Sequence, residues 1–236
     1  MLTGIVVIFG AGGIGWALAH NCCQRDEVSQ VILVGRRQVP NSNHPKLSCL
    51  QLDVFDEDGL QAMLAQTKPN VVVSTIGLLH SDSGSPEKRI ADFSLDWFIQ
   101  SQTSNAAAAL IIGKAINATT KRVDQILFAA LSARVGSISD NSAGGWYSYR
   151  SSKAALNMAI KTLSLEWANS RPKHCVLLLH PGTVATNLSS PFSARVKPEK
   201  LFSPELAAEY LIGLLANAST ADTGKFLAWD GATIEW

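Results

Sequence analysis

The chain has 236 residues, of which 47% are hydrophobic and 17% charged, and its formal net charge is +1. A chain of this length can bury a large core without disulfides or a structural metal, and the composition excludes a disordered protein. The scattered and nearly balanced charges exclude the basic surface that is typical of nucleic-acid binding. We therefore expect no nucleic-acid partner.

The cysteines and the apolar runs argue against a metal site and against membrane insertion. The four cysteines form neither a Cys-x-x-Cys pair nor a cluster with histidine at zinc-like spacing, so we expect structural thiols and no metal. The first apolar run, Ile5–Phe9, lacks the basic leader of a signal peptide. The most apolar segment, Ala106–Ile112, is too short to cross a bilayer. We expect a cytoplasmic protein without membrane contact.

Short apolar runs alternate with longer amphipathic stretches along the whole chain. Most runs are continuous in Val, Ile and Leu, which is typical of strands buried on both faces. The alternation predicts a doubly wound, Rossmann-like α/β sheet of about seven mainly parallel strands with helices on both faces. No linker divides the chain, so residues 1–236 are expected to form one domain. The expected strands are Ile5–Phe9, Val31–Val34, Ser48–Leu52, Val71–Thr75, Ile126–Leu131, Cys175–Leu179 and Lys225–Ala228. The expected helices are Ile14–Arg25, Asp56–Gln66, Leu95–Ala118, Tyr147–Asn169 and Pro204–Ala216, the last with Ser203 as its N-cap.

Two segments interrupt this regularity. His80–Arg89 has no periodicity and is predicted to be a surface loop. Residues 187–203 follow a strand and contain two prolines, and this segment is long enough to form a substrate lid. Ligands bind beyond the carboxyl ends of the strands in such sheets, where these loops gather. An ordinary variable loop is the alternative for this second segment.

The first expected strand leads into the sequence Gly10-Ala11-Gly12-Gly13-Ile14-Gly15, which has the G-x-G-x-x-G spacing. Glycine permits a tight turn and a close approach of the backbone to a pyrophosphate. The start of the following helix offers free N–H groups and the positive end of the helix dipole. The position between a first strand and a helix therefore predicts a dinucleotide site formed by Gly10, Gly12, Gly13, Ile14 and Gly15.

The end of the second expected strand indicates which dinucleotide is bound. Folds that prefer NAD place Asp or Glu there to accept a hydrogen bond from the ribose 2′-hydroxyl. This chain has Arg36 and Arg37 instead, and guanidinium groups bind a 2′-phosphate. We therefore predict NADP(H) as the cofactor. The missing acid also counts against a methyltransferase, which uses an acid at this place for the ribose of its cofactor.

Two further residues are placed near the dinucleotide. Asp53, just after the third expected strand, accepts a hydrogen bond from the adenine amino group or, alternatively, caps the helix that begins near Asp56. Gly77, after the fourth expected strand, allows the backbone to pass close to the cofactor ribose.

Tyr149 and Lys153 are four residues apart within a predicted helix, so their side chains share one face. A phenol titrates near pH 10 and is a poor base at neutral pH. A nearby ammonium group favours the phenolate and lowers this pKa. The pair is therefore the candidate catalytic centre, and Lys153 can also donate hydrogen bonds to the nicotinamide ribose.

Six motifs occur in the order in which one enzyme family has them. They are the glycine turn, Asp53-Val54, Asn105, a serine after the fifth strand, Tyr149-x-x-x-Lys153 and the run from Pro181 to Thr186. The chain resembles the short-chain dehydrogenases/reductases from end to end. The segments Val135–Asn141 and Trp229–Trp236 make it most similar to the C-factor-like subgroup, which is named after a bacterial cell-contact signalling protein. The resemblance implies an NAD(P)-dependent oxidoreductase that acts on a small-molecule carbonyl or alcohol and forms a homodimer or homotetramer through its fourth and fifth helices.

The resemblance also assigns roles to individual residues. It implies that Tyr149 is the general acid/base, that Lys153 tunes it and binds ribose, and that Asn105 holds a water of the proton relay by kinking its helix. Asp53 and Val54 belong to the adenine side of the cofactor site. Ser132 is expected to hydrogen-bond the substrate oxygen, and Val184 and Thr186 are expected to meet the nicotinamide carboxamide.

The chain departs from the family pattern in three places. Its glycine turn is one residue shorter than usual, and Ser74-Thr75-Ile76-Gly77 replaces Asn-Asn-Ala-Gly. Strict alignment also places Ala133 where the catalytic serine belongs, which leaves Ser132 and Ser137 as candidates. We favour Ser132 because it ends the strand. The alternative function is a cofactor-binding signalling or scaffold protein with little turnover. His180, Trp146, Trp229 and Trp236 are expected to be structural or interface residues.

Overall fold

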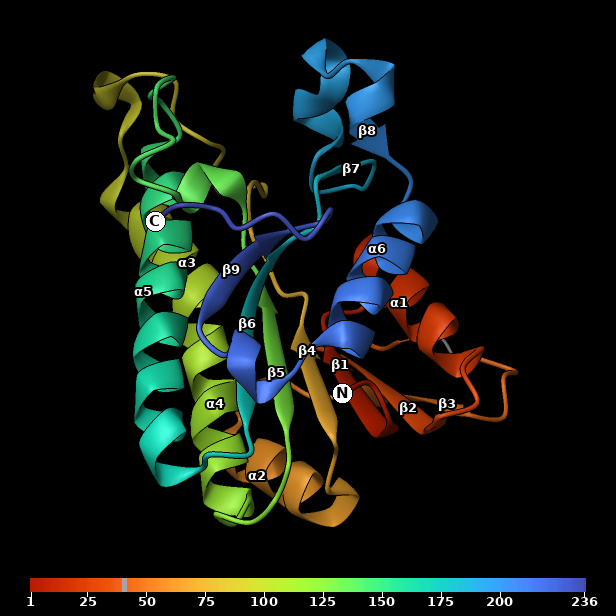
Figure 1. Ribbon diagram of the computed structural model, residues 1–236. Coiled ribbons are helices and arrows are strands. Elements are labelled where there is room, and N and C mark those ends of the chain that lie inside the picture. The colour runs from red at the N-terminus through yellow and green to blue at the C-terminus, as the bar shows by residue number, and fades with distance from the viewer. Residues whose placement is uncertain (40–41) are drawn as a thin grey trace.

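The computed structural model describes residues 1–39 and 42–236, and a parallel sheet runs through its centre. The strands of this sheet are β1 (Gly4–Phe9), β2 (Val28–Gly35), β3 (Leu47–Gln51), β4 (Val71–Ser74), β5 (Leu127–Leu131), β6 (Cys175–His180) and β9 (Lys225–Ala228). They are hydrogen-bonded in the order β3-β2-β1-β4-β5-β6-β9, and every neighbouring pair is parallel (Figure 1). The predicted sheet of seven strands is confirmed.

Helices cover both faces of the sheet. They are α1 (Gly13–Cys23), α2 (Glu57–Thr67), α3 (Leu95–Gln102), α4 (Ala108–Thr119), α5 (Tyr147–Ser170) and α6 (Pro204–Asn217). Figure 1 shows α3, α4 and α5 on one side of the sheet and α1 and α6 on the other. Ser203 caps α6 as expected, because its side chain accepts a hydrogen bond from the Leu206 N–H. The predicted doubly wound architecture is therefore confirmed.

Alternate residues of each central strand supply two separate cores. In β1, Val7 and Phe9 pack in the core that contains residues of α2, α4 and α5, whereas Val6 and Ile8 pack in the core that contains residues of α1 and α6. All four are fully buried. This is why the strands are continuous apolar runs: both faces of the pleat lie in a core.

The helix expected over Leu95–Ala118 is interrupted around Asn105, where the family resemblance implies a kink. A π-helical turn, Thr103–Ala107, separates α3 from α4. Asn105 lies within it and hydrogen-bonds the backbone of Leu78, a residue in a different part of the chain. A π-turn of this kind often occurs at a functional site.

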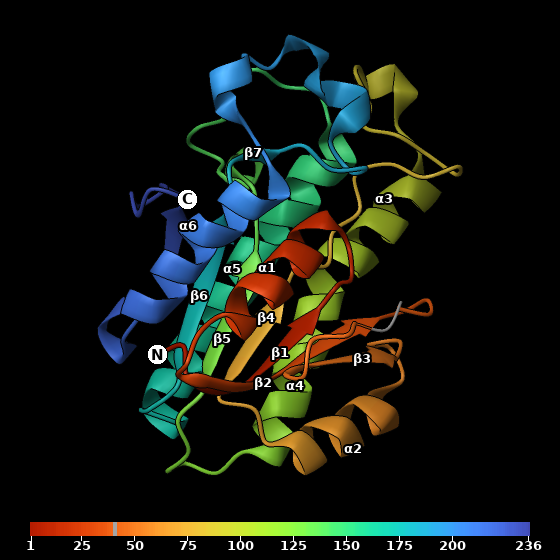
Figure 2. The same cartoon turned by 90° about the vertical axis from the view of Figure 1, so that its right-hand side faces the viewer.

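The segment after β6 contains more structure than a loop. Two short strands, β7 (Thr183–Val184) and β8 (Leu201–Phe202), pair in parallel. Between them lie the 3₁₀ helices Ser190–Arg195 and Pro198–Lys200. Figure 2 shows this segment at the top of the molecule, near the loop that precedes α3. It therefore lies on the side of the sheet where ligands bind.

Within the described residues, no helix has the length and apolar character needed to span a bilayer. The same part of the chain holds no group of three or more His, Cys, Asp or Glu side chains arranged to bind a metal ion. All four cysteines are free thiols, and Cys22, Cys23 and Cys175 are buried.

Candidate active site

Two cavities follow the carboxyl ends of the strands. The larger has a volume of about 480 Å³ and is lined by residues that follow β4, β5 and β6. The smaller has a volume of about 270 Å³ and is lined by residues that follow β1, β2, β3 and β4. Both are lined by Thr75, Ile76 and Gly77, so they adjoin each other at the end of β4. Together they offer an elongated site across the middle of the sheet.

The glycine turn forms one wall of the smaller cavity. Gly10 has a positive φ of 105°, which favours glycine. A Cβ on Gly15 would overlap the carbonyl oxygen of Gly10, so only glycine allows α1 to start this close to the end of β1. Gly12 is the N-cap of α1 without a side-chain hydrogen bond, and a Cβ on it would meet nothing within 4 Å. The start of α1 is therefore open to a ligand and has no acid in its first turn.

The smaller cavity is also lined by Arg36, Asp53 and Val54. Arg36 and Arg37 are both exposed, but Arg37 is outside the described lining. Asp53 accepts a hydrogen bond from the Phe55 N–H at 3.1 Å. The alternative that Asp53 caps the next helix is wrong, because the N-cap of α2 is Asp56.

Tyr149 and Lys153 lie one turn apart on α5, and both line the larger cavity. The Lys153 Nζ donates a hydrogen bond to the carbonyl oxygen of Leu131 at 3.0 Å and lies 5.9 Å from the centre of the Tyr149 ring. Burial raises the pKa of Tyr149 to about 12 and lowers the pKa of Lys153 to about 8. The Tyr149 pKa is therefore raised by burial, which is opposite to the direction expected from a neighbouring ammonium group.

Asn105 is buried behind these two residues. Its Nδ2 donates to the Leu78 carbonyl oxygen at 2.8 Å and to the Ser152 Oγ at 2.9 Å, and its Oδ1 accepts from the Leu78 N–H at 2.7 Å. Ser152 in turn donates to the carbonyl oxygen of Tyr149 at 2.8 Å. Asn105 therefore connects the π-turn to the end of β4 and to α5. The alternative of a helix asparagine bonded to its own backbone is wrong.

The two candidate serines differ in position. Ser132 lines the larger cavity with Tyr149, whereas Ser137 is outside the described lining and accepts a hydrogen bond from the Asp140 N–H. The Ser132 Oγ donates to the Asn157 Oδ1 at 2.6 Å. Because a hydroxyl has only one proton, Ser132 can donate to a substrate oxygen only after it leaves Asn157. Its position in the cavity wall favours Ser132 over Ser137 as the residue that contacts the substrate oxygen. However, the hydrogen bond to Asn157 means that the Ser132 hydroxyl is not free to donate in this structure.

The remaining predicted residues divide into two groups. Ile14, Val184 and Thr186 line the larger cavity, and Gly77 lines both. Four predicted site residues are not among the described lining residues of either cavity: Gly13, Gly15, Arg37 and Asn105. Most of the predicted site is therefore brought together around the two cavities.

Trp146 is part of the cavity wall and also packs against neighbouring aromatic rings. Its ring forms edge-to-face contacts with Tyr149 at 6.1 Å and with Phe192 at 5.3 Å between ring centres. Phe192, from the segment between β7 and β8, also contacts His80 at 5.8 Å. The His80 Nε2 lies 2.9 Å from the Asn187 carbonyl oxygen. The segment after β6 therefore contacts the cavity and the loop before α3 together.

Glu87 is the residue that the sequence analysis missed most clearly. It lies in the predicted surface loop, yet it is 3% exposed. Its carboxylate accepts hydrogen bonds from the N–H and the hydroxyl of Ser148, and its carbonyl oxygen accepts from the Trp146 N–H. Trp146 has a positive φ of 55° directly before α5. Glu87 thus holds the start of the helix that carries Tyr149.

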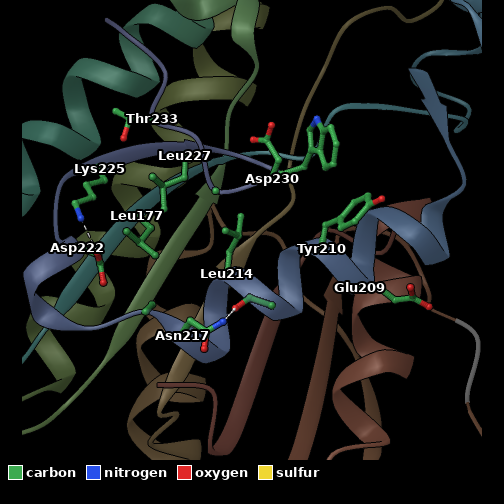
Figure 3. Close-up of a pocket in the computed structure, with 14 residues that line it drawn as sticks. Leu177, Glu209, Tyr210, Leu214, Asn217, Asp222, Lys225, Leu227, Asp230 and Thr233 are labelled. Atoms are coloured by element: carbon green, nitrogen blue, oxygen red, sulfur yellow. Dashed lines mark hydrogen bonds and ion pairs between the residues drawn. The ribbon is translucent and has the colours of Figure 1, made fainter. Parts of the chain in front are cut away.

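A third hollow lies apart from this site, between α6 and β9 (Figure 3). Its volume is about 530 Å³. The dashed lines in Figure 3 mark the Lys225–Asp222 ion pair and the hydrogen bond from Asn217 to the Gly213 carbonyl oxygen. The described lining holds none of the predicted site residues.

A family model described as "Enoyl-(Acyl carrier protein) reductase" matches residues 10–233. The chain belongs to the short-chain dehydrogenase/reductase family. The predicted resemblance is therefore confirmed, and this chain is a member of an oxidoreductase family.

Known proteins resemble this short-chain dehydrogenase/reductase in part or over its whole length. A 1-hydroxy-2-glutathionyl-2-methyl-3-butene dehydrogenase from Rhodococcus sp. (strain AD45) is 42% identical over 106 residues, which are 45% of this chain and 45% of that protein. C-signal from Myxococcus xanthus is 32% identical over 109 residues, 46% of this chain and 60% of that protein. The chain thus matches less than two thirds of either relative. The NADPH-bound carbonyl reductase from chicken fatty liver has the same fold, with a TM-score of 0.84, 22% identity and 99% of each chain covered.

Proposed function

We propose that this chain is an NADP(H)-dependent oxidoreductase that transfers hydride between the nicotinamide and a carbonyl or alcohol substrate. The observation that carries the proposal is that Tyr149 and Lys153 line a cavity adjoining the one formed by the glycine turn. The names of two relatives, a carbonyl reductase with bound NADPH and a dehydrogenase of a hydroxylated compound, support the cofactor and the substrate class.

The residues around the two cavities fit NADP(H). The adenosine half would lie in the smaller cavity. There Asp53 would offer an acceptor to the adenine, Val54 would contact the ring, and Arg36, assisted by Arg37, would offer guanidinium groups to the 2′-phosphate. The free N–H groups at Gly12, Gly13 and Ile14 would bind the pyrophosphate. Gly10 and Gly15 allow the close turn, and Gly77, Lys153, Val184 and Thr186 would hold the nicotinamide half. When bound, this cofactor supplies or accepts the hydride.

Tyr149 acts on the proton of the reaction. With a pKa of about 12 its phenol is protonated at neutral pH, so it can donate its proton to a carbonyl oxygen that gains negative charge during reduction. In the reverse direction the phenolate accepts the proton of the alcohol. Lys153 uses one N–H for the Leu131 carbonyl oxygen and keeps two for ribose hydroxyls. Asn105 is proposed to order a water of the proton relay through the π-turn.

The substrate would enter between α5 and the segment 187–203. Leu188, Phe192 and Val196 of this segment line the larger cavity, which supports a substrate lid. We further propose a homodimer or homotetramer, because apolar side chains are exposed on α3, α4 and α5. These are Leu95, Ile99, Leu110, Met158 and Leu165. The free thiols support a cytoplasmic location.

A signalling or scaffold protein with little turnover is the second candidate. It is favoured by Ala133 at the position of the family's serine, by the hydrogen bond that engages Ser132, and by the similarity to C-signal.

Turnover of a panel of aldehydes and ketones with NADPH tests the first candidate against the second. Tyr149→Phe removes one oxygen and should bind NADPH nearly as tightly as the wild type while turnover falls by roughly 10²-fold or more. Lys153→Met should weaken both binding and turnover. A Tyr149→Phe rate above about a tenth of the wild-type rate would exclude the assigned role.

A further inference from the structure

The larger cavity combines an apolar wall with an excess of positive charge. Its apolar side chains include Leu79, Val135, Trp146, Leu188, Phe192 and Val196. Its charged side chains are three cations and one acid: Arg134, Arg150, Lys153 and Asp140. Lys153 belongs to the cofactor side in the proposed function. The proposed function assigns no role to the two arginines.

Arg150 is held in place by a hydrogen bond and forms no ion pair in the described part of the chain. It follows Tyr149 on α5 and is half-buried. Its Nε donates to the Gly145 carbonyl oxygen at 3.0 Å. The two terminal nitrogens of the guanidinium group have no protein partner in the described part of the chain. An arginine anchored through Nε presents its planar fork with little loss of side-chain entropy on binding.

Arg134 has only a weak internal partner. Its Nη1 lies 3.6 Å from the Asp140 Oδ2, and both side chains are about half exposed. An exposed ion pair at this distance contributes little to stability. A ligand carboxylate can therefore compete with Asp140 for the guanidinium group.

His180 adds a polar but neutral group to the same wall. Its Nδ1 is buried and has no hydrogen-bond partner within the described residues. Burial, followed by the charge of Arg134, lowers the His180 pKa to about 4, whereas Asp230 acts in the opposite direction. The imidazole is thus uncharged at neutral pH, and the positive charge on this side of the cavity resides on the arginines.

We propose that the substrate carries a carboxylate, which Arg150 and Arg134 bind while Trp146 and Phe192 pack against its carbon skeleton. This inference rests on the proposed function, because the carbonyl to be reduced must lie at Tyr149. Guanidinium groups bind carboxylates through two parallel, charge-assisted hydrogen bonds. A carbonyl compound with an apolar skeleton and a carboxylate can contact both the apolar side chains and the arginines, whereas a neutral ketone can contact only the apolar side chains favourably.

A matched pair of aldehydes tests the proposal: para-carboxybenzaldehyde and its methyl ester, each reduced with NADPH. The measured quantity is the ratio of kcat/KM for the acid to kcat/KM for the ester. We expect a wild-type ratio of about ten or more, mainly through KM, and a fall of about tenfold in Arg150→Met. Because each ratio is taken within one variant, general damage to catalysis cancels.

Two further variants sharpen the test. Asp140→Asn removes the acid that competes for Arg134 and should raise the ratio, an effect that structural damage would not produce. Arg122→Met is the matched control, because Arg122 is exposed and donates to the Asn169 carbonyl oxygen at the far end of α5. Its ratio should equal that of the wild type. A wild-type ratio near one, or a ratio unchanged in Arg150→Met, would overturn the proposal.

If neither of these aldehydes nor any member of the carbonyl panel is reduced, the proposed function fails on its own. The carboxylate site is then judged by binding, followed through the fluorescence of tryptophan, since Trp146 lies in the cavity wall. Tighter binding of the acid than of the ester, lost in the Arg134→Met/Arg150→Met variant, would support the site. Equal binding of both compounds would exclude it.

Discussion

The carboxylate of Glu87 accepts two hydrogen bonds from Ser148, the residue directly before Tyr149. Both residues are buried, and the contact joins a loop before α3 to the first turn of α5. An acid at this position also suits the positive end of the helix dipole. Glu87 therefore positions the start of α5, the helix that carries Tyr149, and it is not among the described lining residues of the larger cavity.

Replacing Glu87 with alanine should lower both stability and turnover. The buried N–H and hydroxyl of Ser148 would lose their acceptor, so we expect the free energy of unfolding to fall by about 1–3 kcal/mol. Glu87→Gln keeps one carbonyl acceptor, so its stability and turnover should lie between those of the wild type and those of Glu87→Ala. Urea denaturation and steady-state kinetics measure the effects. Asp82→Ala, an exposed change in the same loop, is the control and should stay within about 0.5 kcal/mol of the wild type. An Ala variant as stable as the wild type would contradict the role.

Reduction should slow as the pH rises through about 8, the pKa of Lys153. Burial lowers this pKa, so the ammonium group is present below it and is lost above it. Tyr149, with its pKa raised to about 12, stays protonated across this range. The kcat/KM of a neutral aldehyde measured against pH should therefore be flat on the acidic side and decline above pH 8. Lys153→Met should lack this decline. A wild-type profile that stays flat well above pH 8 would contradict this prediction, because the pKa of Lys153 would then be higher than about 8.

NADPH should bind more tightly than NADH by about 1–3 kcal/mol, the contribution of one or two charge-assisted contacts. Because Arg36 lines the smaller cavity and Arg37 does not belong to its described lining, Arg36→Ala should reduce this preference more than Arg37→Ala. Titrations followed by tryptophan fluorescence give the affinities. Equal affinities of the wild type for the two cofactors would refute the assignment.

Ser132→Ala should lower turnover more than Ser137→Ala, because only Ser132 lies in the described cavity wall with Tyr149. If the Ser132 hydroxyl leaves Asn157 to reach the substrate, its loss should reduce the rate by up to the roughly 10²–10³-fold that is typical of one such donor. NADPH affinity should be nearly unchanged in both variants. Full activity in both would instead favour the signalling or scaffold protein.

The sequence predicted the sheet well because its signals are local. Apolar runs such as the three valines that begin at Val71 predict strands, and the glycines from Gly10 to Gly15 predict the start of α1. The four-residue spacing of Tyr149 and Lys153 was sufficient to predict that their side chains lie close together, because both residues are on one helix.

The features that the sequence did not predict depend on contacts between distant residues. The resemblance implied a kink at Asn105, but the hydrogen bonds between Asn105 and Leu78, which are 27 residues apart, leave no sign in the periodicity. Glu87 and Ser148 are 61 residues apart, so a buried acid resembled an ordinary loop residue. The predicted shift of the Tyr149 pKa was downward, whereas burial raises it in the structure. A neighbouring charge is visible in a sequence, but burial is not.

The contacts of Phe192 affect how the cavity can open. Its ring meets Trp146 of the cavity wall and His80 of the loop before α3, and His80 is also 2.9 Å from the Asn187 carbonyl oxygen. Lifting this ring away from Trp146 therefore also disturbs its contact with His80. If substrate enters beside Phe192, as the proposed function has it, we expect its admission and the release of product to require that the two loops separate together.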